Sequence, residues 1–142
     1  MPSFSIGHLE KERIEVNLLG RPADPKKEGY DWIRASVHVE TGGLRGDVEI
    51  MICVSDVIGF KEELEPVYRE LSGTAEFKTL EGQLYIRVEA NKLGHVQTSG
   101  YLRDDFISAN ELRFEIFYDQ TLLRRTISEI DKALSELSKK TE

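Results

Sequence analysis

Residues 56–71, DVIGFKEELEPVYREL, decide the fold. The period of the apolar residues changes here from two residues, typical of a strand, to about 3.6 residues, typical of a helix. Four apolar residues, spaced by four, three and four positions, share one face of a predicted helix: Phe60, Leu64, Val67 and Leu71. Ser55 or Asp56 is the expected N-cap, and Ser72-Gly73 is the expected stop. Pro66 removes one helical hydrogen bond, and we expect it to bend the helix rather than end it.

A second helix is predicted over residues 121–138, and its first part repeats the pattern of the first helix. Residues 119–134 read DQTLLRRTISEIDKAL, so a shift of 63 positions carries the first apolar stripe onto the second. The apolar positions of this second helix are Leu123, Ile127, Ile130, Leu134 and Leu137. The same shift carries Asp56 onto Asp119, and we interpret both as structural caps worth about 1 kcal/mol each.

Strand-like alternation of apolar and polar residues precedes each helix. In the strand that begins near Tyr30, one face carries Ile33, Ala35, Val37 and Val39, and the other carries Trp32, Arg34, Ser36 and His38. Residues 20–29 hold two prolines and two glycines and are expected to form an exposed loop. The other predicted strands cover residues 14–18, 47–54, 74–80, 83–90, 94–103 and 111–118.

The order of these elements predicts an α+β fold, ββββα-ββββα, of mainly antiparallel sheet with two helices packed on it. The 63-residue correspondence suggests an internal pseudo-twofold repeat with half-repeats 1–72 and 73–142. A chain of 142 residues has room for one domain, so we expect residues 1–142 to form a single unit.

The charge balance narrows the classes of partner. With 26 Asp and Glu against 19 Lys and Arg, the net charge is −7, which disfavours sequence-independent nucleic-acid binding and suits a basic partner. No apolar run approaches the ~20 residues that span a membrane, and the first residues do not form a signal segment. We therefore expect no membrane contact and a cytoplasmic location. The single cysteine, Cys53, lies in an apolar run and is predicted to be buried.

Catalytic and metal-binding signatures are weak. There is no glycine-rich phosphate loop, no nucleophile elbow and no His-x-x-x-His pair, and His8, His38 and His95 are far apart in the sequence. Asp104-Asp105 is most simply a solvated turn. We predict no catalytic, cofactor-binding or metal-binding residues, and no enzymatic activity.

Two features are candidates for binding a partner. Four acidic residues lie off the apolar stripe of the first helix and form its outer face: Glu62, Glu63, Glu65 and Glu70. The simplest explanation is that these side chains form a solvated surface, and the more specific alternative is a binding site for a basic protein. The one tryptophan, Trp32, is either a sheet-packing residue or a binding anchor.

An ordered series of short motifs gives the chain a family resemblance. It runs from Asp31-Trp32 through the Gly-Gly-Leu-Arg-Gly turn at 42–46 and residues 100–104, GYLRD, to Asp119-Gln120-Thr121-x-Leu123. Over roughly residues 30–135 the chain resembles the WapI-type immunity family, small bacterial proteins associated with contact-dependent and polymorphic toxin systems. The resemblance implies a non-catalytic protein that binds a cognate toxin domain in the producing cell. Such toxins are often nucleases with basic surfaces.

Three functional hypotheses remain open on the sequence. The leading one is an immunity-type inhibitor that occludes a basic toxin domain. The second is a structural or regulatory module that forms a homodimer through a sheet edge or the Trp32 face. The third is an enzyme or small-ligand binder with a pocket between sheet and helices that uses Asp104, Asp105 or His95. Sedimentation at two concentrations separates the second from a monomeric inhibitor, and a deep polar pocket would favour the third.

Overall fold

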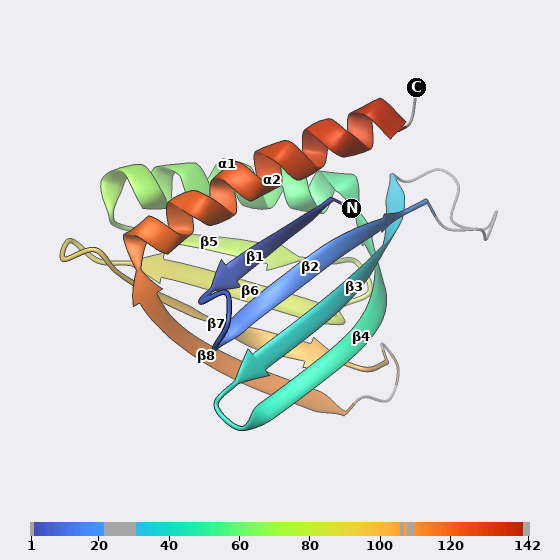
Figure 1. Ribbon diagram of the computed structural model, residues 1–142, viewed down its shortest axis with the longest axis horizontal. Coiled ribbons are helices and arrows are strands. Elements are labelled where there is room, and N and C mark those ends of the chain that lie inside the picture. The colour runs from blue at the N-terminus through green and yellow to red at the C-terminus, as the bar shows by residue number, and fades with distance from the viewer. Residues whose placement is uncertain (1, 22–30, 106, 108–109, 141–142) are drawn as a thin grey trace.

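The computed structural model describes residues 2–21, 31–105, 107 and 110–140, the side chains of residues 139 and 140 excepted. Within them, two four-stranded antiparallel sheets are each followed by a helix, in the predicted order ββββα-ββββα (Figure 1). Most of the predicted loop at residues 20–29 lies outside the described residues.

Sheet A contains the first four strands in sequence order, and helix α1 follows it. The elements are β1 (Ser3–Gly7), β2 (Arg13–Gly20), β3 (Trp32–Thr41), β4 (Leu44–Cys53) and α1 (Val54–Glu70). The residues predicted for the apolar face of β3 are all buried. The fourth strand begins at Leu44, three residues before the predicted start, because Gly42-Gly43 forms the whole turn and Thr41 pairs with Leu44.

Sheet B and helix α2 repeat this arrangement in the second half of the chain. The elements are β5 (Thr74–Lys78), β6 (Leu84–Ala90), β7 (His95–Arg103), β8 (Glu111–Asp119) and α2 (Gln120–Lys140). Each predicted strand of this half is present within a few residues of its expected bounds. Each sheet alternates buried residues on its inner face with more exposed residues on its outer face.

The two halves exchange their helices. Helix α1 packs against β5 of sheet B, helix α2 packs against β1 of sheet A, and the two helices contact each other along one side of the molecule, at the top of Figure 1. Glu63 of α1 accepts a hydrogen bond from the backbone of Glu76 in β5 at 3.1 Å, and Thr126 of α2 donates one to the carbonyl of Ser5 in β1 at 2.6 Å. Glu63 and Thr126 are 63 positions apart, and Ser5 and Glu76 are each the third residue of their strand. Equivalent helix positions therefore bind equivalent strand positions of the opposite half.

Side chains of α2 satisfy the outward backbone groups of β1. Glu129 Oε1 accepts the amide of Ser5 at 2.9 Å, and Arg125 donates to the carbonyl of Gly7 at 2.7 Å. These bonds occupy backbone groups at the edge of sheet A, so that β1 does not offer them to another strand.

The buried face of α2 differs from the predicted stripe. The buried residues of this helix are Leu123, Thr126, Ile130, Ala133 and Leu137, whereas Ile127 and Leu134 are only partly buried, because Thr126 turns toward β1.

Helix α1 begins earlier than predicted. Its N-cap is Cys53, so neither Ser55 nor Asp56 occupies that position, and the helix runs through Pro66 to a left-handed C-cap at Leu71. Cys53 is buried, as predicted. No helix in the described ranges is long and apolar enough to cross a membrane.

Candidate functional site

The four acidic residues of α1 fall on different parts of the helix surface. Glu62 and Glu70 are exposed, and neither carboxylate has a hydrogen bond or ion pair within the described part of the chain. Glu63 is also exposed, but its Oε1 holds the amide of Glu76. Glu65 is half-buried on the side that faces α2, where Lys61 lies 3.4 Å away. The outer face is therefore acidic, and two of its carboxylates already have intramolecular partners.

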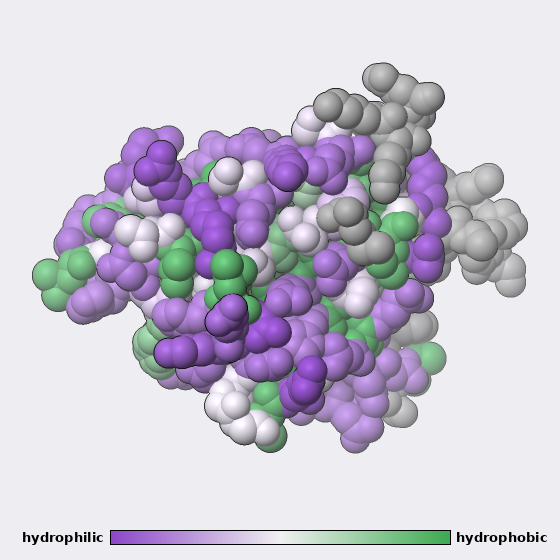
Figure 2. Space-filling view, viewed as in Figure 1, coloured by the Kyte–Doolittle hydropathy of each residue, from purple (hydrophilic) through white to green (hydrophobic). Residues whose placement is uncertain are grey.

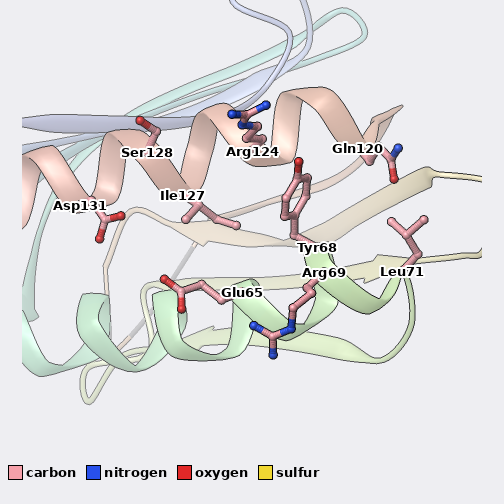
Figure 3. Close-up of a pocket in the computed structure, with 9 residues that line it drawn as sticks. All are labelled: Glu65, Tyr68, Arg69, Leu71, Gln120, Arg124, Ile127, Ser128 and Asp131. Carbon is pink, nitrogen blue, oxygen red and sulfur yellow. The ribbon is translucent and has the colours of Figure 1, made fainter.

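An open groove of about 700 Å³ lies between α1 and α2 (Figure 3). Tyr68 from α1 points toward α2, and Ile127 enters from α2. Glu65 and Asp131 line one end of the groove, and Lys61 bridges these carboxylates, 2.5 Å from Asp131. Because the lining mixes apolar groups with charges of both signs, it points to no single ligand chemistry. The remaining lining residues are Arg69, Leu71, Gln120, Arg124 and Ser128.

The two aspartates predicted to cap helices act on different backbone groups. Asp119 Oδ1 accepts the amide of Thr121 at 2.9 Å, in the first turn of α2, and this bond lowers the pKa of Asp119. Asp56 is the third residue of α1, and its Oδ2 accepts the amide of Cys53 at 2.9 Å. Burial raises the pKa of Asp56. A capping residue missed by the sequence analysis is Asp31, whose carboxylate accepts the amide of Ser55 at 2.8 Å from outside the helix.

Trp32 is only 7% exposed, at the start of β3. Its surroundings include a hollow of about 300 Å³, which is also lined by Gly20, Arg21, Asp31, Ile33, Val54 and Leu137. The indole thus packs within the fold in this structure. Its role as a binding anchor remains a prediction.

The outer face of sheet A is a network of ion pairs centred on His38. The Nδ1 atom of His38 is 2.5 Å from Asp47 Oδ1, and Nε2 is 2.9 Å from Glu40 Oε1. Arg13 in turn contacts Glu40 at 3.3 Å. Burial of the ring opposes protonation, but the hydrogen bonds to Asp47 and Glu40 outweigh it, so the pKa of His38 is raised. The side of the molecule with sheet A in front is predominantly hydrophilic, with scattered apolar residues (Figure 2).

The raised pKa of His38 predicts a pH dependence of stability. Because the folded state favours the protonated ring, its contribution is fully present below the unfolded pKa of about 6.5 and is lost as pH rises through the folded value. We expect the free energy of unfolding, measured with urea, to fall more steeply from pH 6 to 8 in the native chain than in His38→Gln. Equal slopes would show that the two carboxylates do not stabilise the imidazolium.

Two of the three residues suggested for ligand chemistry have structural partners. Asp104 binds the backbone and the side chain of Asn110, both at 2.8 Å, and Asp105 accepts the amide of Ile107 at 3.0 Å. The third, His95, is exposed at the start of β7, where it pairs in register with Asp119 of β8. Among the described residues, no three His, Cys, Asp or Glu side chains are grouped as a metal site would need.

The outer face of sheet B carries a group of aromatic and cationic residues that the sequence analysis did not bring together. Tyr85 and Tyr101 are paired across β6 and β7, with ring centroids 5.6 Å apart at an interplanar angle of 31°. The guanidinium of Arg103 lies 4.5 Å from the centre of the Tyr101 ring. Phe117 is 60% exposed on the neighbouring strand β8. Alternation along each predicted strand assigns these residues to its outer face. It does not show which residues of neighbouring strands lie side by side, because that depends on strand register.

Comparisons with known proteins address both fold and family. The model of the immunity protein WapI-like family matches residues 5–138, nearly the whole chain. A search of curated proteins finds no match. A chain from the structure described as "Crystal structures of trypanosoma bruciei MRP1/MRP2" superposes with a TM-score of 0.54 at 13% identity, over 99% of this chain and 88% of that one. This likeness shows a shared fold.

Proposed function

This chain belongs to the immunity protein WapI-like family, and from that premise we propose that it is a non-catalytic inhibitor that binds a basic toxin domain and occludes its working surface. The family suggests an inhibitor of a toxin, and the match over residues 5–138 is the observation that carries the proposal. Occlusion needs a stable complementary surface rather than a reactive group. Each helix is hydrogen-bonded to the sheet of the opposite half, and this arrangement supports such a surface.

The placement of the polar side chains supports binding rather than chemistry. Asp104, Asp105 and Asp119 hydrogen-bond to nearby backbone amides, and His38 sits between two carboxylates. Each of these polar groups thus has a structural partner within the fold, at the backbone between β7 and β8, at the start of α2 or on the outer face of sheet A.

Charge supports a basic partner. The net charge is −7, and the exposed carboxylates of Glu62 and Glu70 extend from the outer face of α1. Opposite charge on a partner raises the rate of encounter, and salt weakens this effect because the screening length is about 8 Å at physiological ionic strength. We therefore propose electrostatically steered association in the cytoplasm, with this face of α1 in the contact.

Reversing charge on α1 is expected to slow association with the toxin. Glu62→Lys combined with Glu70→Lys leaves the Glu63–Glu76 hydrogen bond intact and changes two carboxylates that lack intramolecular partners among the described residues. Charges at the rim of an interface act mainly on the association rate, so we expect a several-fold slower rate and little change in dissociation. The measurement begins by reading the adjacent genes for a large toxin with a variable C-terminal domain. Association kinetics with that domain are then recorded across a salt series.

A matched control makes the same change of charge elsewhere. Glu10→Lys combined with Glu49→Lys alters the β1–β2 turn and the outer face of sheet A, where the exposed ion pair of Glu49 with Arg34 at 3.5 Å contributes little stability. It should slow association less than the α1 pair does. A rate that is independent of salt and equal in both double variants would contradict steering by α1. Self-association detected by sedimentation at two concentrations, without toxin binding, would instead favour the homodimeric module.

A further inference from the structure

Neither helix covers the outer face of sheet B, which carries the side chains that point away from the core. Along β8, the inner residues Phe114, Ile116 and Tyr118 are buried, whereas the alternate residues are exposed. The register places Tyr85 beside Tyr101, Tyr101 beside Arg113, and Gln97 beside Phe117. We use the name sheet B face for the surface formed by Tyr85, Arg87, Tyr101, Arg103, Arg113 and Phe117.

The aromatic centre of the sheet B face is held in place by neighbouring groups. The hydroxyl of Tyr85 donates to Glu76 Oε2 at 2.5 Å, and this bond helps to raise the pKa of Tyr85 to about 12. Arg103 lies over Tyr101 and donates to Glu111 at 2.8 Å. Tyrosine and arginine dominate binding energy at protein interfaces, and side chains that are already ordered lose less entropy when a partner binds.

The equivalent face of sheet A differs in chemistry. The 63-residue shift that aligns the helices carries His38 onto Tyr101 and Glu40 onto Arg103. His38 is bonded to two carboxylates, and Trp32 is only 7% exposed. In the described part of sheet A, the outer face therefore presents ion pairs, whereas sheet B adds to its own ion pairs two half-buried tyrosine rings and the exposed ring of Phe117. The two halves share an architecture but not a surface.

The sheet B face is continuous with the acidic face of α1. The hydrogen bond between Glu63 and Glu76 joins them, and a hollow of about 230 Å³ between α1 and β5 is lined by Glu63, Glu76 and Lys78. Four strands about 4.8 Å apart and about seven residues long give a face of roughly 15–20 Å by about 25 Å. With the bordering α1 surface, this approaches the ~800 Å² that each partner contributes to a standard interface. The arginines of the face pair with carboxylates of the same sheet, Arg87 with Glu89, and Arg103 and Arg113 with Glu111. The further carboxylates that α1 adds at the border therefore suit a basic occupant.

Resting on the proposed function, we propose that the toxin domain docks on the sheet B face, with Tyr85 and Tyr101 as its central anchors and Glu62 and Glu63 of α1 at its rim. The occupant is a basic protein surface. Its lysine or arginine side chains lie beside the bordering carboxylates, because Arg103 already lies over the Tyr101 ring. Its apolar groups cover Phe117, which is otherwise exposed.

The test is the affinity of variants for the catalytically disabled C-terminal domain of a large toxin found in the adjacent genes. Tyr101→Ala should raise the Kd by roughly 30-fold or more, as loss of a central anchor does. Tyr101→Phe keeps the ring beneath Arg103 and should raise it less than about threefold. Arg34→Ala, a change on the outer face of sheet A, should leave the Kd within about twofold.

Phe117→Ser provides a second route that does not disturb the tyrosine pair, because this ring is mostly exposed. It should raise the Kd by roughly five- to tenfold, with an unchanged melting temperature. If the native chain binds and both Tyr101→Ala and Phe117→Ser keep native affinity, the docking inference is wrong while the proposed function stands. If Arg34→Ala weakens binding while Tyr101→Ala and Phe117→Ser do not, the contact surface lies on sheet A instead. If the native chain does not bind, the proposed function itself fails.

Discussion

Replacing Phe77 with alanine is expected to lower the free energy of unfolding by roughly 3–5 kcal/mol. The ring is fully buried in β5 and meets Phe60 of α1 edge to face, with centroids 5.5 Å apart and an interplanar angle of 76°. This contact joins the helix of one half to the sheet of the other. Truncation would remove the apolar surface of the ring and leave a cavity at the junction. Since a domain is stable by only about 5–15 kcal/mol, the loss is a large share of the total.

Urea unfolding of Phe77→Ala and Phe77→Leu measures this effect. Leucine refills most of the cavity, so that variant should lose less than about half as much stability. Combining Phe77→Leu with Phe60→Leu should give a coupling of about 0.5–1.5 kcal/mol, the usual value of an aromatic pair beyond its burial. Additive losses, or a loss below about 1 kcal/mol for Phe77→Ala, would show that the junction is not packed as described.

Gly100→Ala is expected to destabilise the fold by about 3 kcal/mol or more, although it adds a single methyl group. A Cβ atom at this position would lie 1.9 Å from the carbonyl oxygen of Tyr85 and 3.0 Å from the ring of Phe114. The first of these atoms belongs to the backbone of the neighbouring strand, so β6 and β7 would have to separate. Overpacking of this kind forces shifts in the backbone. The change should also perturb the adjacent Tyr101.

Gly59→Ala is the matched control for that substitution. Gly59 lies within α1, and a Cβ atom there would meet nothing within 4 Å. Because alanine is favoured over glycine in a helix by about 1 kcal/mol, this variant should gain stability. Thermal or urea unfolding measures the stability of both variants relative to the native chain. A Gly100→Ala protein as stable as the native chain would mean that the two strands are not as close as the structure places them.

The helices and the inner faces of the strands were predictable, because they depend on the spacing of residues that are close in sequence. The spacing of Phe60, Leu64 and Val67 is typical of a helix with one buried face, and all three are buried. Leu71, the fourth residue of the predicted stripe, lies just beyond the helix as its left-handed C-cap and is only partly buried. Alternation in β3 identified its inner face for the same reason. The 63-residue shift predicted equivalent helices, and their reciprocal contacts with β1 and β5 match that equivalence. The order of elements followed directly.

Other features depend on residues distant in sequence and so left no local pattern. Asp31 binds the first turn of α1 from the start of β3, so a search beside the helix for its cap pointed to Ser55 and Asp56. Thr126 is buried in place of Ile127 because it donates to a strand more than 100 residues away. The need for glycine at position 100 comes from Tyr85 on another strand.

The candidate binding surface was predictable only in part. Acidic residues off the apolar stripe indicated an outer face of α1, but the sequence could not show that Glu63 holds β5 and Glu65 faces α2. The pairing of Tyr85 with Tyr101 depends on strand register, and the exposure of Phe117 depends on which faces the helices leave open. Trp32, the aromatic residue most conspicuous in the sequence, is buried.

The function proposed for this chain is to bind and inhibit a toxin domain. The most direct measurement is a calorimetric titration of the native chain into the C-terminal domain of a large toxin found in the adjacent genes, followed by a toxin activity assay at the same ratios. We predict a stoichiometric complex and a loss of toxin activity that is complete at the equivalence point. Absence of heat at micromolar concentrations, with toxin activity unchanged by excess of the chain, would contradict the claim.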